Sequence, residues 1–433
     1  MSDNLEKVDE NIDQDKEKHP LAIIIDDFVH SILDIRECET RLSHVAKNQL
    51  IEEAEKITQE LQSGINLLES TDNKNEQILA IKIIESNMRK AKRFRNSDLI
   101  NTFNRSLFIN LFSAFDKLSG NLLSVLYERK PVLFNSVNRD ISLSEVLSLN
   151  SINELKNSIL LDEIDSFRRK SYAEQFGDLE SKFSINLRKF DSWPLFVECS
   201  QRRNLLTHCD GIVSSQYIKI CKENGYKNLK DIAIGDKLEI DDVYFHSACV
   251  LTLEVGVMLC QTLWRKVLPK ELSDADNHLH RLIYSFLGRD DWFIAIKLSQ
   301  FANNLPKYSN EITRRIILIN YSIALCAINK RPSAIKLLEK EDWSATTLDF
   351  RLATSIIKED YDEAKSIMLL IGQQGELLDE LGYHEWPLFR DFRNTDQFLE
   401  AYNEIYEYPY VEKLNEMAEK SIKNNIELNA SDT

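Results

Sequence analysis

The segment Arg203-Asn204-Leu205-Leu206-Thr207-His208 contains the side-chain types that cleavage of RNA without a metal requires. Such cleavage uses the ribose 2′-hydroxyl as an internal nucleophile on the adjacent phosphate. Histidine can transfer protons near neutral pH, and the planar arginine guanidinium can stabilise the charge of the phosphorane. We therefore take His208 as the candidate proton-transfer group, Arg203 as the charge-stabilising group, and Asn204 as the residue that orients His208 or the phosphate.

The spacing of these residues limits how one chain can use them. Asn204 and His208 are four residues apart, so they share one face of a helix. Arg203 and His208 are separated by about 140° around a helix axis, so one helix does not easily direct both side chains to one point. We expect a complete site to need two protomers, with the two motif helices facing each other across a two-fold axis. The spacing therefore predicts a homodimer or a higher even-numbered oligomer.

The same segment resembles the signature of the HEPN superfamily, in which Arg, a polar residue, a few further residues and His form a metal-independent ribonuclease site. The stretch Phe112-Ser-Ala-Phe-Asp116 is similar to part of an early helix of that family, which carries an acidic residue near the Arg. Asp116 is therefore a supporting candidate. Arg202 is a second one, because its distance from His208 also fits the looser family spacing.

This resemblance covers about residues 76–268. It implies a HEPN-type helical bundle, RNA as the substrate, a site shared by two protomers and products with 2′,3′-cyclic phosphate ends. Such proteins often act as toxins or in defence against phage, and the resemblance predicts the same role here.

A second interpretation stays open, in which the domain is a catalytically inactive HEPN module for dimerisation or binding. The net charge of −16 favours it, because an acidic protein repels the phosphate backbone and opposes general nucleic-acid binding. The complete Arg203, Asn204 and His208 set favours the enzyme, since an inactive site has no chemical reason to keep all three.

Any RNA contact of so acidic a chain must be local, and the sequence offers two basic stretches. Residues 186–230 hold eight Arg and Lys side chains against four Asp and Glu. The run Arg89-Lys-Ala-Lys-Arg-Phe-Arg95 places five cations around one aromatic residue. This run is either a guide for RNA or a solvated helix end.

The sequence predicts neither a metal nor a cofactor. Seven scattered cysteines form no Cys-x-x-Cys pair, and their odd number favours a reducing compartment. His278 and His280 are interpreted as surface residues, and the other histidines show no metal-ligand spacing. The first residues lack the order of a signal peptide, and the apolar runs are too short to span a bilayer. We expect a cytoplasmic protein with no membrane contact.

The elements that must position these residues are predicted to be helices. Glycine (11) and proline (8) are scarce, and apolar residues recur at helical spacing. Asp116 falls on a helix predicted from Ser97 to Tyr127, and the motif falls on one that begins at Trp193-Pro194. The segment 232–240, with Gly235-Asp236 between alternating apolar residues, predicts a small β-hairpin insertion in an all-α protein.

The domain organisation predicted from the sequence has the HEPN-type helical domain at its centre. Around residue 271 the pattern changes, and three similar segments follow, each with a polar turn before an Ala and a Lys. Their alanines, Ala295, Ala334 and Ala364, are 39 and 30 residues apart, on either side of the period of about 34 of tetratricopeptide (TPR) repeats. A TPR-like α-solenoid is therefore expected to bind a protein regulator or trigger. The predicted boundaries are a disordered tail at 1–18, a helical hairpin at 19–75, the HEPN-type domain at 76–269, the solenoid at 270–420 and a frayed tail at 421–433.

Overall fold

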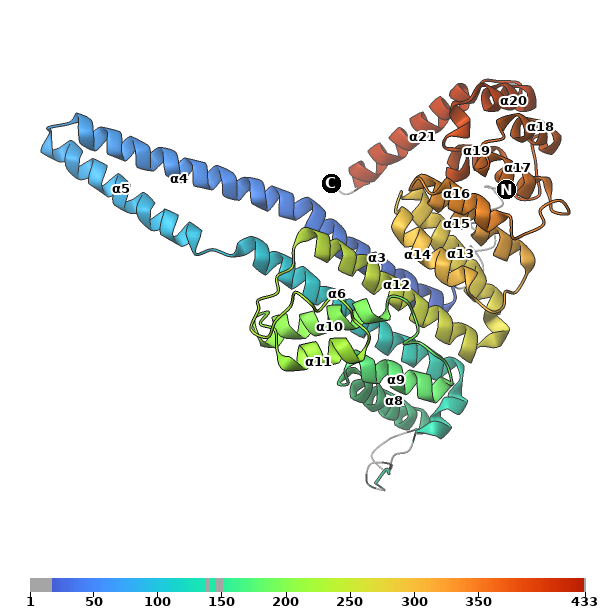
Figure 1. The fold of residues 1–433 in the computed structure, drawn as a ribbon, viewed down its shortest axis with the longest axis horizontal. Helices are drawn as coiled ribbons and strands as arrows, with labels where there is room; N and C mark the ends of the chain where they lie inside the picture. Colours follow the sequence, from blue (N-terminus) through green and yellow to red (C-terminus); the bar gives the residue numbers. More distant parts are fainter. Residues whose placement is uncertain (1–17, 138–139, 143, 145, 147–150, 432–433) are drawn as a thin grey trace. The chain divides into compact units, whose positions relative to one another are not determined.

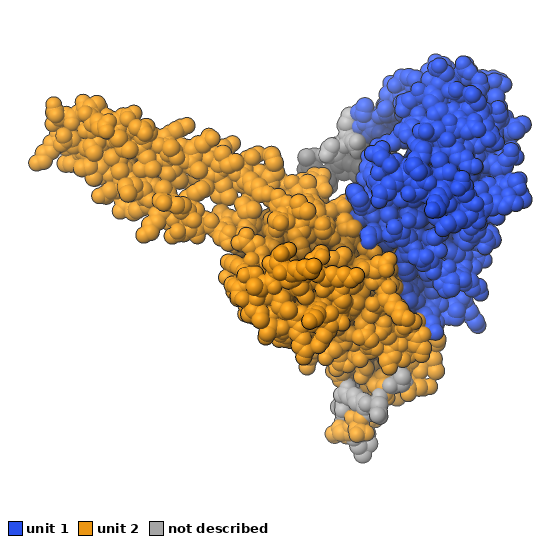
Figure 2. All heavy atoms as spheres, in the orientation of Figure 1, with its two compact units in different colours: residues 1–23, 260–433 blue, residues 24–259 orange. Residues whose placement is uncertain are grey.

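The computed structural model describes residues 18–137, 140–142, 144, 146 and 151–431. All regular secondary-structure elements in this described part are helices, which confirms the predicted all-α class. The chain divides into two compact units (Figure 2): unit 1 comprises Met1–Ile23 and Cys260–Thr433, and unit 2 comprises Ile24–Leu259. These limits differ from the predicted boundaries at 75 and 269.

The first helices of unit 2 differ from the predicted hairpin within residues 19–75. Helix α3 (Pro20–Cys38), a π-helical segment (Glu39–Ser43) and α4 (His44–Ser70) follow one another without a break. The chain reverses at residues 71–73, and α5 (Lys74–Arg95) packs antiparallel on α4 (Figure 1). The hairpin partner of α4 is therefore α5, whose residues were predicted to belong to the next domain.

An aromatic core joins α6 (Leu99–Arg129), α9 (Tyr172–Phe183) and α10 (Trp193–His208). Phe115 lies at its centre, with ring centroids 4.9 Å from Phe196 and 5.4 Å from Tyr172. Such edge-on and tilted ring contacts stabilise a core beyond the apolar area that they bury. Asp116 follows Phe115 on α6, so this core positions the helix face that carries it. The other rings of this core are Phe108, Phe112, Phe176 and Trp193.

Helix α8 (Ile152–Arg168) packs on α6 and ends just before α9. Ser171 begins α9 with a capping box: its hydroxyl accepts from the Glu174 amide, while the Glu174 carboxylate accepts from the Ser171 amide at 2.9 Å. This cap determines where Tyr172 enters the core.

The predicted hairpin within 232–240 is wrong, because the segment pairs with another part of the chain. After α10, residues 211–213 run beside 235–238: the Val213 amide donates to the Asp236 carbonyl at 2.8 Å, and the Leu238 amide donates to that of Gly211 at 2.9 Å. The pairing is one isolated antiparallel bridge and not a strand ladder. Leu238 packs beside α11 (Ser215–Glu223), against the buried Leu205, Val213, Tyr217 and Cys221.

Among the described helices, α12 (Asp242–Val267) alone is long and apolar enough to be a candidate for crossing a membrane. However, 67% of its most apolar window is buried within the protein, as expected for a core helix. Gly256 lies on this helix where a Cβ would come within 2.4 Å of the Phe28 ring of α3. The close approach of α3 and α12 therefore depends on this glycine.

Unit 1 contains successive antiparallel helix pairs, and the two helices of each pair are joined by a turn of the same kind. The pairs are α13 (Leu272–Gly288) with α14 (Trp292–Asn303), α15 (Glu311–Ala327) with α16 (Arg331–Leu338), and α17 (Leu348–Ile357) with α18 (Tyr361–Ile371). Each turn has one non-glycine residue at a φ near +60°, five residues before a fully buried alanine. The turn residues are Asp290, Asn329 and Glu359, and the alanines are Ala295, Ala334 and Ala364.

Shorter elements follow these pairs: α19 (Glu380–Glu385), the 3₁₀ turns Pro387–Phe389 and Phe392–Asn394, and α20 (Asp396–Tyr406). Helix α21 (Tyr410–Ser431) then covers most of the stretch predicted to be a frayed tail from residue 421. The structure therefore differs from that prediction up to residue 431.

Candidate active site

Asp116 and Arg203 meet where α6 and α10 pack together, although 87 residues separate them in the chain. The Arg203 Nη2 atom lies 3.5 Å from Asp116 Oδ2, and its Nη1 atom donates to Asn204 Oδ1 at 3.1 Å. The Arg203 guanidinium carbon lies 5.8 Å from the centre of the Phe112 ring. These contacts hold the guanidinium in one place, and its side chain is 25% exposed.

The Nε atom of Arg203 is buried and has no hydrogen-bond partner within the described part of the chain. Burying a hydrogen-bond donor without a partner costs free energy, so such an atom in a folded protein requires an explanation. The unpartnered donor shows that Asp116 and Asn204 do not use the full hydrogen-bonding capacity of this guanidinium.

Two residues that were not predicted from the sequence, Tyr172 and Arg168, complete the surroundings of Asp116. The Tyr172 hydroxyl donates to Asp116 Oδ1 at 2.6 Å, and the Arg168 Nε donates to the Asp116 backbone carbonyl at 3.1 Å. The Arg168 guanidinium lies directly over Gly120, where a Cβ would clash with it. Gly120 in the middle of an apolar helix is the one signal in the sequence that a group packs closely there.

Burial raises the pKa of the Asp116 carboxyl, while Tyr172, Arg203 and Arg168 act in the opposite direction. The same burial, together with the Asp116 carboxylate, raises the pKa of Tyr172 well above its ordinary value. Tyr172 therefore remains a neutral hydroxyl donor at neutral pH. Perturbed groups of this kind gather at functional sites and also in structural networks.

Arg202 does not join this cluster, although it precedes Arg203 directly. Its guanidinium lies 3.9 Å from the centre of the Tyr244 ring, and its Nε donates to Glu198 Oε1 at 2.9 Å. The buried Glu198 carboxylate also accepts from the hydroxyls of Tyr217 and Tyr244, both at 2.7 Å. Arg202 therefore belongs to a satisfied interior network, and Arg203 is the arginine of the motif that faces Asp116.

His208 is the last residue of α10, and its side chain is exposed. The helix ends there because Asp210 and Gly211 adopt positive φ values, and a Cβ on Gly211 would lie 2.7 Å from the Leu238 carbonyl oxygen. Arg105 of α6 reaches both sides of His208: it donates to the Leu206 carbonyl and, at 2.6 Å, to the Asp210 carboxylate.

The structure thus brings Asp116, Arg203 and Asn204 together and leaves His208 apart from them. Arg203 and His208 are both in regular helix, so they are about 7.5 Å apart along the axis of α10 and about 140° apart around it. Among the described residues, His208 has no hydrogen-bond partner and no ion pair. An exposed imidazole without partners is free to meet a substrate.

The basic stretch 186–230 is weaker than its composition indicates, because half of its eight cations are ion-paired. Arg188 lies 2.7 Å from Glu180, and Lys219 lies 3.9 Å from Glu223. Arg202 and Arg203 are held by Glu198 and Asp116. The cations of this stretch without such a pair are Lys189, Lys222, Lys227 and Lys230.

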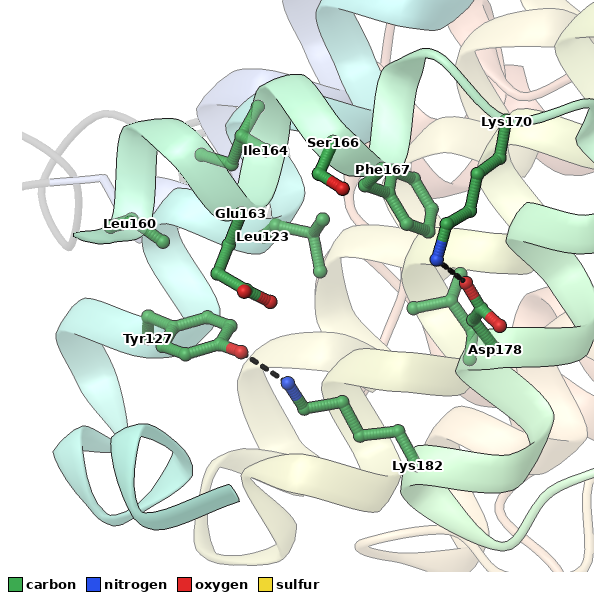
Figure 3. A pocket seen from close by; sticks show the side chains of 11 residues that line it. Leu123, Tyr127, Leu160, Glu163, Ile164, Ser166, Phe167, Lys170, Asp178 and Lys182 are labelled. Atoms are coloured by element: carbon green, nitrogen blue, oxygen red, sulfur yellow. Dashed lines mark hydrogen bonds and ion pairs between the residues drawn. The ribbon is translucent and has the colours of Figure 1, made fainter. Parts of the chain in front are cut away.

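A separate small cavity of about 100 Å³ lies among α6, α8 and α9 (Figure 3). Its two lysines already have partners: Lys170 lies 2.7 Å from Asp178, and Lys182 contacts the Tyr127 hydroxyl. Pockets for small ligands are usually larger, about 300–1,000 Å³. None of the predicted site residues lines this cavity, so it adds nothing to the candidate site.

The described residues contain no group of three or more His, Cys, Asp or Glu side chains that could hold a metal ion. Comparisons with protein-family models, with curated proteins and with solved structures give no match to this chain.

Proposed function

We propose that this chain is a metal-independent RNA endonuclease of HEPN type that works as a homodimer or a larger even-numbered oligomer. The observation that carries the proposal is the exposed, unpartnered His208 on the same helix as Arg203, whose guanidinium is held by Asp116 and Asn204. A cytoplasmic toxin or an effector of defence against phage is the role that we infer. The helix pairs of unit 1 would then bind a protein that controls the activity, because repeated helix pairs offer extended binding surfaces.

The proposed chemistry is an internal phosphoryl transfer. The 2′-oxygen attacks the adjacent phosphorus, the bond from phosphorus to the 5′-oxygen breaks, and the products are a 2′,3′-cyclic phosphate and a 5′-hydroxyl. His208 carries one of the two proton transfers, from the 2′-hydroxyl or to the 5′-oxygen, and water carries the other. Arg203 stabilises the negative charge that develops on the phosphorane oxygens.

The same geometry supports a second candidate, an inactive HEPN module for dimerisation or binding. Asp116 already neutralises Arg203 within the chain, which reduces the charge that Arg203 can offer to a phosphate. In this alternative the cluster stabilises the packing of α6 on α10, and the helix pairs of unit 1 provide the working surface.

Incubation of the purified protein with mixed RNAs in EDTA distinguishes the ribonuclease from the inactive binding module. We expect cleavage to persist in EDTA with 2′,3′-cyclic phosphate ends, and His208→Ala and Arg203→Ala to lower the rate by a factor of about 100 or more. His30→Ala is the matched control, because His30 is also an exposed histidine of unit 2. It should leave the rate unchanged.

His208→Ala should also leave the thermal unfolding midpoint unchanged, because an exposed side chain without partners contributes little to stability. A strict requirement for magnesium, or wild-type rates in both variants, would show that the proposed mechanism is wrong. No cleavage by the wild-type dimer of any RNA would favour the binding module.

A further inference from the structure

The last turns of α5 form a concentrated positive surface on this acidic protein. Residues 89–95 contain five cations, of which Arg89 lies 3.8 Å from Glu85 and Lys90 lies 3.1 Å from Glu60. Lys92, Arg93 and Arg95 are exposed and have no ion pair among the described residues. We call these three residues the α5 basic cluster.

Acidic side chains lie near this cluster but do not pair with it. Glu52, Glu53 and Glu55 lie on the antiparallel α4, and Asp98 precedes α6, but none of them forms an ion pair with the cluster in the described structure. Lys92 and Arg95 are three residues apart and therefore share a helix face. The three cations of the cluster are therefore unpaired and exposed, so an anionic partner can contact them.

The α5 basic cluster leads along the chain toward His208. Helix α6 begins at Leu99, four residues after Arg95. The Cα of Arg95 is therefore no more than about 24 Å from that of Arg105, given four steps of about 3.8 Å and six helical steps of about 1.5 Å. Arg105 contacts Leu206 and Asp210, which lie two residues before and two residues after His208. Figure 1 shows α5 leading into the first turns of α6.

A second cation lies beside Arg105. The Lys237 Nζ atom is 3.5 Å from the carboxylate of Asp210, which Arg105 also binds, so two cations face one acidic group. These two cations lower the pKa of Asp210 below its usual range. The surroundings of His208 therefore continue the positive surface.

We infer that Lys92, Arg93, Arg95, Arg105 and Lys237 form a track that binds the phosphate backbone of a single RNA strand and delivers it to His208. The inference rests on the proposed function, because it assumes that His208 is where RNA is cleaved. Single-stranded RNA is the partner that fits: the cations contact phosphates in any sequence, and each neutralised phosphate releases counterions. Such local binding also explains how a chain of net charge −16 can hold RNA.

The test measures binding separately from cleavage. Fluorescence anisotropy follows a 2′-O-methyl oligouridine of about 20 nucleotides, which lacks the nucleophile for cleavage but offers the same backbone. The triple variant K92Q/R93Q/R95Q removes the α5 basic cluster and keeps good helix formers. The matched control is K307Q/K340Q/K358Q, which removes three exposed, unpaired lysines of unit 1, outside both basic stretches.

We expect the α5 variant to weaken binding about tenfold. It should also flatten the slope of log K against log salt by about 2, because each phosphate contact with a single strand contributes about −0.7 to that slope. The control variant should change neither quantity. Unchanged binding by the α5 variant, an equal loss in both variants, or no binding by the wild-type protein would each overturn the track.

Cleavage assays keep the two proposals separate. If wild-type protein binds the oligonucleotide through the track but cleaves no RNA, the ribonuclease proposal fails and the binding track stands. If it cleaves RNA while the α5 variant binds normally, the track fails and the ribonuclease stands. Circular dichroism and thermal unfolding of both triple variants show whether each keeps the helical content and stability of the wild-type protein.

Discussion

Arg202 and Arg203 are neighbours on α10, and successive residues of a helix point about 100° apart, so their guanidinium groups reach different surroundings. Arg202 is 11% exposed and pairs with Glu198, which is 3% exposed. Arg203 pairs with a more accessible carboxylate and keeps one donor without a partner. At the scale of single residues, one arginine is structural and the other faces the candidate site.

This difference predicts unequal costs for the same substitution. Arg202→Met should lower the free energy of unfolding by about 3 kcal/mol or more, because it leaves the Glu198 carboxylate buried without its cation. Arg203→Met should cost only about 1 kcal/mol, since Asp116 keeps the Tyr172 hydroxyl and is partly exposed. Urea denaturation followed by circular dichroism measures both values. Equal losses would contradict this division of roles.

At the scale of elements, the first helix of each pair in unit 1 ends with the same C-terminal capping motif. After the first helix of each pair, the residue with positive φ is followed by an amide that donates back to a carbonyl five residues earlier, at 2.8–3.0 Å. This is the Schellman arrangement, in which glycine is usual at the left-handed position. Here Asp290, Asn329 and Glu359 occupy it, and aspartate and asparagine tolerate that conformation better than glutamate does.

Glu359→Gly should therefore raise the stability of unit 1 by about 0.5–1 kcal/mol, because glycine adopts the left-handed conformation without a steric cost. The ion pair of Glu359 with Arg331 is lost, but Glu359 is 53% exposed there and the pair contributes little. Lys358→Gly is the adjacent control: Lys358 has a right-handed conformation, so glycine should destabilise. A decrease in the urea midpoint for Glu359→Gly would contradict the strain argument.

At the scale of the whole molecule, the positions of Arg203 and His208 on one helix predict that catalysis needs two chains. A 1:1 mixture of the Arg203→Ala and His208→Ala proteins, unfolded and refolded together, should recover up to about a quarter of wild-type activity. Half of the resulting dimers are mixed, and each mixed dimer can form one complete site of two. Each variant alone should stay inactive.

Light scattering of the same samples should show a dimer or a larger even-numbered assembly of the 50.3 kDa chain. A strictly monomeric protein at micromolar concentration that still cleaves RNA would exclude the shared site. The single variants Arg203→Ala and His208→Ala would still test the separate role of each residue.

The sequence by itself determined the features that depend on neighbours in the chain. The all-α class followed from apolar residues at helical spacing and from scarce glycine and proline. The three similar turns in unit 1 were visible as Ala295, Ala334 and Ala364, because each turn residue with positive φ lies five residues before its alanine. The residues proposed for chemistry were also chosen locally, since Arg203, Asn204 and His208 lie on one short segment.

Only the tertiary structure decided which groups distant in the chain meet. The partner of α4 is α5 and not a helix within residues 19–75, and residues 235–238 pair with 211–213 and not with one another. Tyr172 and Arg168 reach Asp116 from other helices, and nothing in their own segments marks them. Arg202 and Arg203 have the same chemistry and adjacent positions, so their roles depend on which side of α10 packs on Glu198 and which on Asp116. The packing of apolar faces sets the rotation of α10 about its axis. The same packing brings together residues that are far apart in the sequence and share no local pattern.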